Sequence, residues 1–172
     1  MSNKLKTQLI CYDDYRWFSE EVRRRFDDTE RYTVISFVTV EDFMAYIERG
    51  KDKSYCKVAI LGAHDTPEQF EMIGRLTREI KKIDKHTGII LVCTPDKTDE
   101  IKKVIPSGVD AYIPKNTNAI LRLHNAVKKL ISEHGISIFR KRRNLSFYVL
   151  IGFVIIFLAL IAVAWFKLPL FF

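Results

Sequence analysis

The sequence predicts an α/β domain in which helices cover both faces of a five-stranded parallel sheet, followed by one apolar helix. Two observations predict the sheet. Short β-rich runs alternate five times with amphipathic stretches along residues 7–131. Three of these runs are apolar throughout, which is typical of strands that are buried on both faces. Right-handed crossover connections then give a doubly wound (βα)₅ domain.

The β-rich runs and the periodic stretches between them locate each element. The expected strands are Thr7–Tyr12, Tyr32–Val38, Lys57–Gly62, Gly88–Cys93 and Val109–Pro114. A one-sided helix follows each strand, because apolar residues recur there at helical spacing. The apolar residues that mark these helices are Phe18, Val22 and Phe26; Val40, Phe43, Met44 and Ile47; Phe70, Ile73, Leu76, Ile80 and Ile83, which are expected to face inward; Ile101, Val104 and Ile105; and Ile120, Leu123, Val127, Leu130 and Ile131.

Two residues mark helix ends within this pattern. Gly50 ends the second helix, since glycine is common just after a helix C-terminus. Pro67 begins the third helix, because proline is favoured in the first turn.

The segment from Phe147 to Phe166 contains no charged side chain. At about 1.5 Å per residue, such a helix spans roughly the 30 Å of a bilayer's hydrocarbon. A basic run precedes it and only Lys167 follows, so the domain is expected in the cytoplasm and the C-terminus across the membrane. The basic run consists of Arg140, Lys141, Arg142 and Arg143. This arrangement predicts a single-pass, tail-anchored membrane protein.

These features divide the chain into four expected parts. The domain occupies residues 1–133, and a basic juxtamembrane linker follows at 134–146, with a break in the helix near Gly135. The transmembrane helix is expected at 147–166 and a short tail at 167–172.

The net charge of +7 belongs mainly to the membrane flank. Without the basic run and Lys167, 23 of the 28 basic residues remain against 21 acidic ones. A nucleic-acid-binding domain gathers positive charge on its own surface, so we expect no nucleic acid partner. Cations beside a bilayer instead favour contact with anionic lipid head groups.

The three cysteines indicate neither a metal site nor a disulfide framework. Cys11, Cys56 and Cys93 lie far apart and form no Cys-x-x-Cys pair, and the four histidines share no ligand spacing. We expect the cysteines to be small core residues in a reducing compartment.

Polar residues gather at the carboxyl ends of the expected strands, where sheets of this kind bind ligands. Asp13 and Asp14 follow the first strand, Cys93 and Thr94 the fourth, and Lys115 the fifth. Adjacent carboxylates can hold Mg²⁺, a hydroxyl or thiol can touch an oxyanion, and a lysine can pair with it. Structural alternatives stay open: either aspartate can cap the first helix, Thr94 can begin a turn, and Lys115 can be a solvated loop residue.

This order of residues resembles the receiver domain of bacterial two-component response regulators (CheY-like, flavodoxin-type fold) over residues 5–131. Receivers carry an acidic pair after the first strand, which Asp13 and Asp14 match. They carry a phosphoryl-accepting aspartate at the end of the third strand and a Thr or Ser at the end of the fourth. Receivers keep a fixed interval between this hydroxyl residue and a lysine after the fifth strand. Counting that interval back from Lys115 places the hydroxyl position on Cys93, with Thr94 beside it.

The resemblance continues around the fifth strand and fails at the third. Segment 108–115 keeps the family's glycine, a switch-type aromatic at Tyr112 and the lysine at Lys115. The acceptor position falls on Gly62 or, counted back from the following proline, on Ala63, and neither side chain can take a phosphoryl group. The resemblance therefore implies a degenerate pseudo-receiver that is not an enzyme. It needs no cofactor, and any Mg²⁺ on the vestigial acidic pair would be weakly bound.

The leading hypothesis is a pseudo-receiver tethered to the bacterial inner membrane, which signals through protein contacts without its own phosphorylation. By resemblance, the face that meets partners, or that pairs two copies in a homodimer, would include Ile101, Val104, Tyr112 and Leu121.

Two alternatives stay open. In the first, the domain is an atypical receiver that is phosphorylated on Asp65, with Mg²⁺ held at Asp13 and Asp14. In the second, the chain is a structural subunit of a membrane protein assembly.

Overall fold

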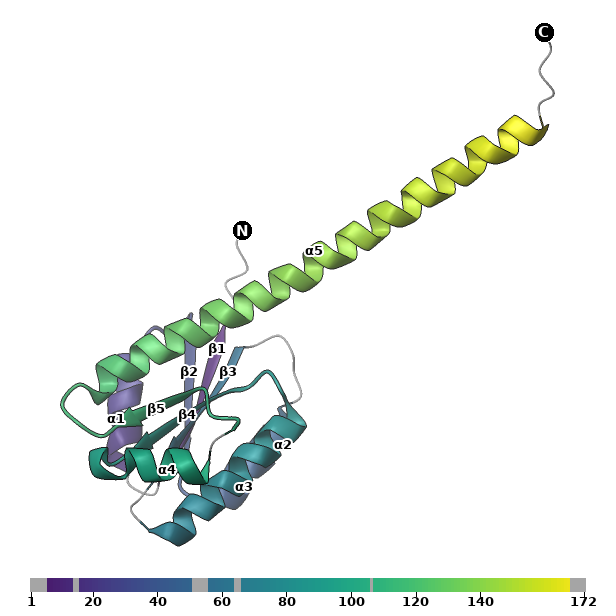
Figure 1. Cartoon of the computed structure of the whole chain (residues 1–172). Helices are drawn as coiled ribbons and strands as arrows, with labels where there is room; N and C mark the ends of the chain where they lie inside the picture. Colours follow the sequence, from purple (N-terminus) through teal and green to yellow (C-terminus); the bar gives the residue numbers. More distant parts are fainter. Residues whose placement is uncertain (1–5, 14–15, 51–55, 64–65, 106, 168–172) are drawn as a thin grey trace. The chain divides into compact units, whose positions relative to one another are not determined.

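The computed structural model describes residues 6–13, 16–50, 56–63, 66–105 and 107–167 (Figure 1). Within these ranges, the side chains of residues 16–17, 137–148, 159 and 162–167 lie outside the description. The chain divides into two compact units, Met1–Ser132 and Glu133–Phe172.

The first unit is built on one five-stranded parallel sheet with the strand order β2-β1-β3-β4-β5. The strands are β1 (Thr7–Tyr12), β2 (Tyr32–Phe37), β3 (Cys56–Gly62), β4 (Gly88–Cys93) and β5 (Ala111–Pro114). The predicted parallel sheet is therefore confirmed. β5 begins two residues later than expected, because Asp110 uses its own carboxylate to accept the backbone N–H of Ile89 at 2.7 Å.

In the described part of the chain, five α-helices and one short 3₁₀ turn (Pro95–Lys97) connect and follow the strands. The helices are α1 (Arg16–Arg25), α2 (Val40–Arg49), α3 (Pro67–Ile83), α4 (Thr98–Val104) and α5 (Ala119–Lys167). Thr39 caps α2 by accepting the N–H of Asp42 on its hydroxyl at 3.3 Å. α3 begins at Pro67, as the sequence predicts.

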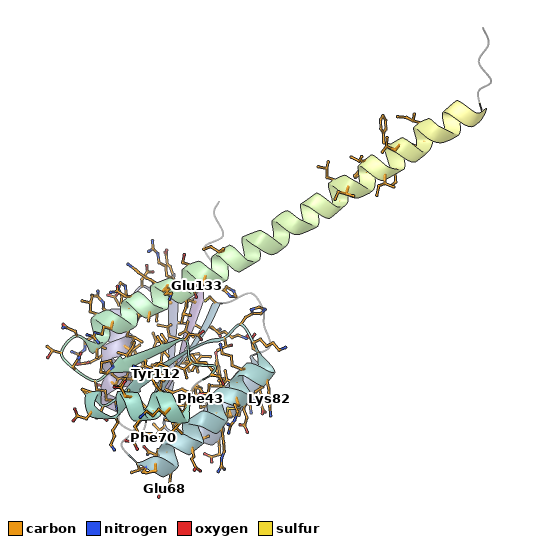
Figure 2. All side chains as sticks on the ribbon, viewed as in Figure 1. Phe43, Glu68, Phe70, Lys82, Tyr112 and Glu133 are labelled. Carbon is orange, nitrogen blue, oxygen red and sulfur yellow. The ribbon has the colours of Figure 1, made fainter. Side chains whose placement is uncertain are left out.

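Two separate cores lie on the two faces of the sheet. Figure 1 shows α2, α3 and α4 on one face, and α1 with the first turns of α5 on the other. Figure 2 shows Phe43 and Phe70 on the inner sides of α2 and α3, with Glu68 and Lys82 pointing outward from α3. Both phenylalanines are buried, whereas Glu68 and Lys82 are exposed. The apolar spacing in the sequence thus corresponds to the buried side of these two helices.

A glycine allows α5 to approach the sheet closely. A Cβ atom on Gly88, the first residue of β4, would lie 2.8 Å from Cδ1 of Leu130 on α5. No ordinary Cβ contact is that short, so Leu130 packs where a larger residue would place its side chain.

In the second unit, the helical backbone of α5 continues through Gly135, so the break expected there is wrong. A glycine costs a helix only about 1 kcal/mol relative to alanine, and the helix-forming residues around it outweigh this cost.

Further along α5 lies an apolar stretch whose described side chains are exposed. Every large apolar side chain described between Val149 and Ile161 is exposed, with fractions from 39% to 69%. Across the described part of the chain, no helix combines the length and the hydropathy that a membrane crossing requires. The basic run at 140–143 and parts of the expected span, 147–148, 159 and 162–166, lie outside the described side chains.

Candidate functional site

The candidate site lies at the carboxyl ends of β1, β3, β4 and β5, where the strand register brings distant residues level. Asp13 follows β1 directly, and its backbone N–H donates to the carbonyl of Phe37 at the end of β2 (3.3 Å). Its side chain is only 3% exposed. Asp14, the second member of the predicted acidic pair, lies outside the described residues.

The carboxylate of Asp13 packs against the end of β3. A Cβ atom on Gly62 would lie 2.8 Å from Oδ1 of Asp13 and 3.3 Å from its Cγ. Any side chain at position 62 would therefore begin in space that Asp13 fills. Glycine is the one residue that leaves Asp13 in place.

Ala63, the other candidate for the acceptor position, lies just beyond β3. Its N–H donates to the carbonyl of Val92 at 2.7 Å, and its methyl group is buried in the core shared with Cys93. Since Gly62 pairs with Val92, Ala63 is level with Cys93. Neither Gly62 nor Ala63 brings an oxygen to the site, and Asp65 lies outside the described residues.

At the end of β4, the polar contact is made by a residue that the sequence analysis missed. Cys93 is fully buried, and its Sγ lies 3.5 Å from Oγ1 of Thr98. The Thr98 hydroxyl also donates to the carbonyl of Thr94 at 3.2 Å. Thr98 is the first residue of α4, about one turn after the strand. The sequence could have indicated its role, because the hydroxyl of a threonine four residues after Thr94 can donate a hydrogen bond back to the Thr94 carbonyl.

Lys115 and Asp13 line two different cavities. The N–H of Lys115 donates to the carbonyl of Cys93 at 2.7 Å, which fixes the loop after β5 on the sheet. The side chain of Lys115 lines a cavity of about 650 Å³ together with residues of α1. Asp13 lines another cavity, of about 280 Å³, with Arg23 and Ser36. Arg23 donates to the Ser36 hydroxyl there at 3.0 Å.

The thiols are poor nucleophiles in this environment. Burial raises the pKa of Cys11 to about 12; the negative charge of Asp13 adds to this shift and the positive charge of Arg23 opposes it. Burial likewise raises the pKa of Cys56 to about 11. Only the thiolate reacts or binds metals well, so both cysteines act as core residues, as the sequence suggests.

The aromatic residue of β5 is tied to the end of α4. The hydroxyl of Tyr112 donates to the backbone carbonyl of Ile105, and the ring packs against the core on that face of the sheet (Figure 2). Burial raises the pKa of Tyr112, and the proximity of Cys93 raises it further. Tyr112 is therefore half-buried and held in one position by its hydroxyl.

The predicted contact face needs one correction. Val104 and Leu121 are exposed, at 48% and 53%, and are available to a partner. Ile101 is 1% exposed and belongs to the core, because α4 is short and turns this residue toward the sheet. A surface around α4, β5 and α5 therefore excludes Ile101.

Among the described residues, no group of three or more His, Cys, Asp and Glu side chains is placed to hold a metal ion. Asp13 supplies an oxygen ligand of the kind that Mg²⁺ prefers, but its predicted neighbour Asp14 is not described.

Comparison with solved structures identifies the fold. A receiver domain protein from Clostridium thermocellum matches with a TM-score of 0.60 and 17% identity, over 76% of this chain and 98% of that one. A CheY-like receiver domain protein from Methanospirillum hungatei matches with a TM-score of 0.56 and 18% identity, over 77% and 98%. A Thermotoga maritima response regulator in complex with Mg²⁺ and BeF matches with a TM-score of 0.54 and 21% identity, over 72% and 98%.

No protein-family model and no curated protein matches the sequence. The chain has the fold of response regulator receiver domains.

Proposed function

We propose that this chain is a pseudo-receiver, which acts in two-component-type signal transduction by protein contact and not by its own phosphorylation. The receiver fold supports the signalling part of the proposal. The end of β3 supports the other part, because Gly62 and Ala63 stand where receivers carry the accepting aspartate.

The packing of Asp13 on Gly62 is the observation that carries this proposal. Forming an acyl phosphate requires a carboxylate beside the metal ion and in line with the donor phosphorus. Here the carboxylate after β1 fills the space next to β3, 2.8 Å from where a Cβ of residue 62 would lie. Among the described residues at the end of β3, Asp13 then has no acceptor carboxylate to serve.

The output of such a domain is a docking surface. Val104 on α4 and Leu121 on α5 expose apolar area, which a protein partner or a second copy would cover. Between them, Tyr112 is held by its hydroxyl on Ile105. A surface fixed in this way is available without a phosphorylation step.

We also place the domain at the bacterial inner membrane, facing the cytoplasm. Support comes from the uncharged run 147–166, the preceding cations at 140–143, and the exposed apolar side chains from Val149 to Ile161. Burying such area stabilises a protein by roughly 25 cal/mol per Å², so lipid is a favourable environment for it. Confinement to a membrane also raises the effective concentration of the domain, which helps weak contacts to form.

Phosphorylation of a fragment tests the central claim. We expect residues 1–139, incubated with Mg²⁺ and radiolabelled acetyl phosphate, to incorporate no label. Label that is lost in Asp65→Ala but kept in Asp96→Ala, a matched carboxylate in the loop after β4, would establish the atypical receiver instead.

Fractionation tests the membrane assignment. The full-length protein should stay with the membrane pellet after alkaline carbonate extraction and enter the supernatant only with detergent. Recovery in the supernatant without detergent would contradict this part of the proposal.

A further inference from the structure

We propose that the groove between α1 and the β5–α5 connection binds a phosphate-bearing organic anion of about nucleotide size. The groove has a volume of about 650 Å³ and is formed by one side of α1, the connection at 115–117 and the first turn of α5. Small-molecule sites commonly have volumes of roughly 300–1,000 Å³. This inference does not depend on the function proposed above.

Unpaired positive charge converges on this groove. Arg24, Arg25 and Lys115 line it, against a single carboxylate, that of Glu21. None of these three cations takes part in an ion pair among the described residues. Some other cations of the domain are paired, as in Lys97 with Glu100 at 2.7 Å. The groove therefore keeps an uncompensated positive charge that suits an anion.

A histidine on the neighbouring turn of α5 is affected by the positive charge of Arg25. The pKa of His124 is lowered by desolvation and then by the positive charges of Lys128 and Arg25. Arg25 thus acts on α5 across the space between the two helices, which agrees with its place in the groove.

The donor types favour phosphate. Guanidinium groups match phosphate oxygens in bidentate pairs, and a lysine contributes a strong point charge. Asn116 and Thr117 add neutral hydrogen-bonding groups to the lining. The backbone beneath them is fixed by bonds from Asn116 N–H to the Pro114 carbonyl at 2.9 Å and from Ala119 N–H to the Asn116 carbonyl at 2.8 Å. Little ordering is then needed on binding.

The size and the floor of the groove favour an organic anion over a free phosphate ion. Phe18 and Ala119, both buried, and the half-buried Ile120 form an apolar side that inorganic phosphate would leave unused. A nucleotide can place its phosphates at the cations and its less polar part along this side. ATP is therefore the probe we choose.

The test uses the full-length protein in non-ionic detergent with EDTA and a fluorescent N-methylanthraniloyl ATP, followed by anisotropy. We expect saturable binding that unlabelled ATP reverses. Lys115→Glu and Arg24→Glu should each weaken it roughly tenfold or more, because each removes a charge-assisted hydrogen bond. The matched control Lys103→Glu, an equal charge change on exposed α4, should change the dissociation constant less than about twofold.

Three outcomes would overturn the inference: no saturable binding, an equal loss in Lys103→Glu, or displacement of the probe by polyglutamate as effectively as by ATP. The third outcome would assign the groove to an acidic peptide. Far-ultraviolet circular dichroism checks that each variant is folded. Where a glutamate variant fails to fold, Lys115→Gln or Arg24→Gln takes its place, with Lys103→Gln as the control.

Discussion

Replacing Gly62 with alanine tests directly whether Asp13 fills the space beside the end of β3. The added Cβ would lie 2.8 Å from Oδ1 of Asp13, whereas ordinary contacts begin at 3.4 Å. Asp13 is 3% exposed, so moving its carboxylate away from this contact disturbs a buried side chain. Overpacking of this kind costs about 1–3 kcal/mol, and replacing a strand glycine returns about 0.5–1 kcal/mol. We expect a net loss of about 1–2 kcal/mol.

The assay is urea unfolding of the 1–139 fragment, followed by circular dichroism, as a double-mutant cycle with Asp13→Ala. In the Asp13→Ala background the clash is absent, so Gly62→Ala should be neutral or slightly stabilising. The coupling free energy should then be about 1–3 kcal/mol. Gly74→Ala is the control, because its Cβ would meet Ile105 at an ordinary 3.5 Å and should show no coupling to Asp13. A Gly62→Ala cost that is equal in both backgrounds would refute the reasoning.

Three further predictions concern the framework that positions the site. Gly88→Ala should lower the unfolding free energy by about 1 kcal/mol or more, because of the 2.8 Å contact with Leu130, and Leu130→Ala should remove that penalty in a urea titration. Asp110→Ala should cost about 1–3 kcal/mol by leaving the Ile89 N–H without its acceptor, while Asp110→Asn, which keeps an oxygen there, should lose much less. Burial by itself would raise the pKa of Asp84. Hydrogen bonds from the His86 N–H and the Thr87 hydroxyl, together with the charge of Lys57, outweigh burial, so the pKa of this carboxyl lies below its ordinary value. This carboxylate therefore stabilises the fold above its unfolded pKa, and the contribution is lost as the pH falls through the lower folded value. Acid titrations of stability should be less steep for Asp84→Asn than for wild type below about pH 4, and identical curves would contradict the assignment.

Periodicity in the sequence predicts most of this fold, because most strands and helices of the first unit bury apolar residues at the spacing that marks them. The start of β5 differs from the prediction, and this difference has a side-chain cause. The carboxylate of Asp110 accepts the backbone N–H of Ile89, in place of a backbone carbonyl of the neighbouring strand, so β5 begins at Ala111. Ile101 on α4 is buried against the sheet. The sequence does not predict this, because the apolar spacing of so short a helix does not show which of its residues faces the sheet.

The candidate site is less accessible to sequence reasoning, since it depends on contacts between residues far apart in the chain. The order of polar residues correctly locates Asp13 and Lys115 directly after their strands and Cys93 at the end of its strand. It does not show that Asp13 packs on Gly62, nor that Lys115 lines a groove with α1. These contacts follow from how closely neighbouring elements approach, which no local pattern encodes.

The fit between Asp13 and Gly62 limits which single substitutions the end of β3 can accept. Any side chain introduced at position 62 would begin 2.8 Å from Oδ1 of Asp13 and would meet a steric penalty there. The next residue, Ala63, already has a Cβ atom packed in the core. A carboxylate added to this end of the strand therefore meets its first obstacle at a different atom in each position, Cβ at position 62 and the atoms beyond Cβ at position 63.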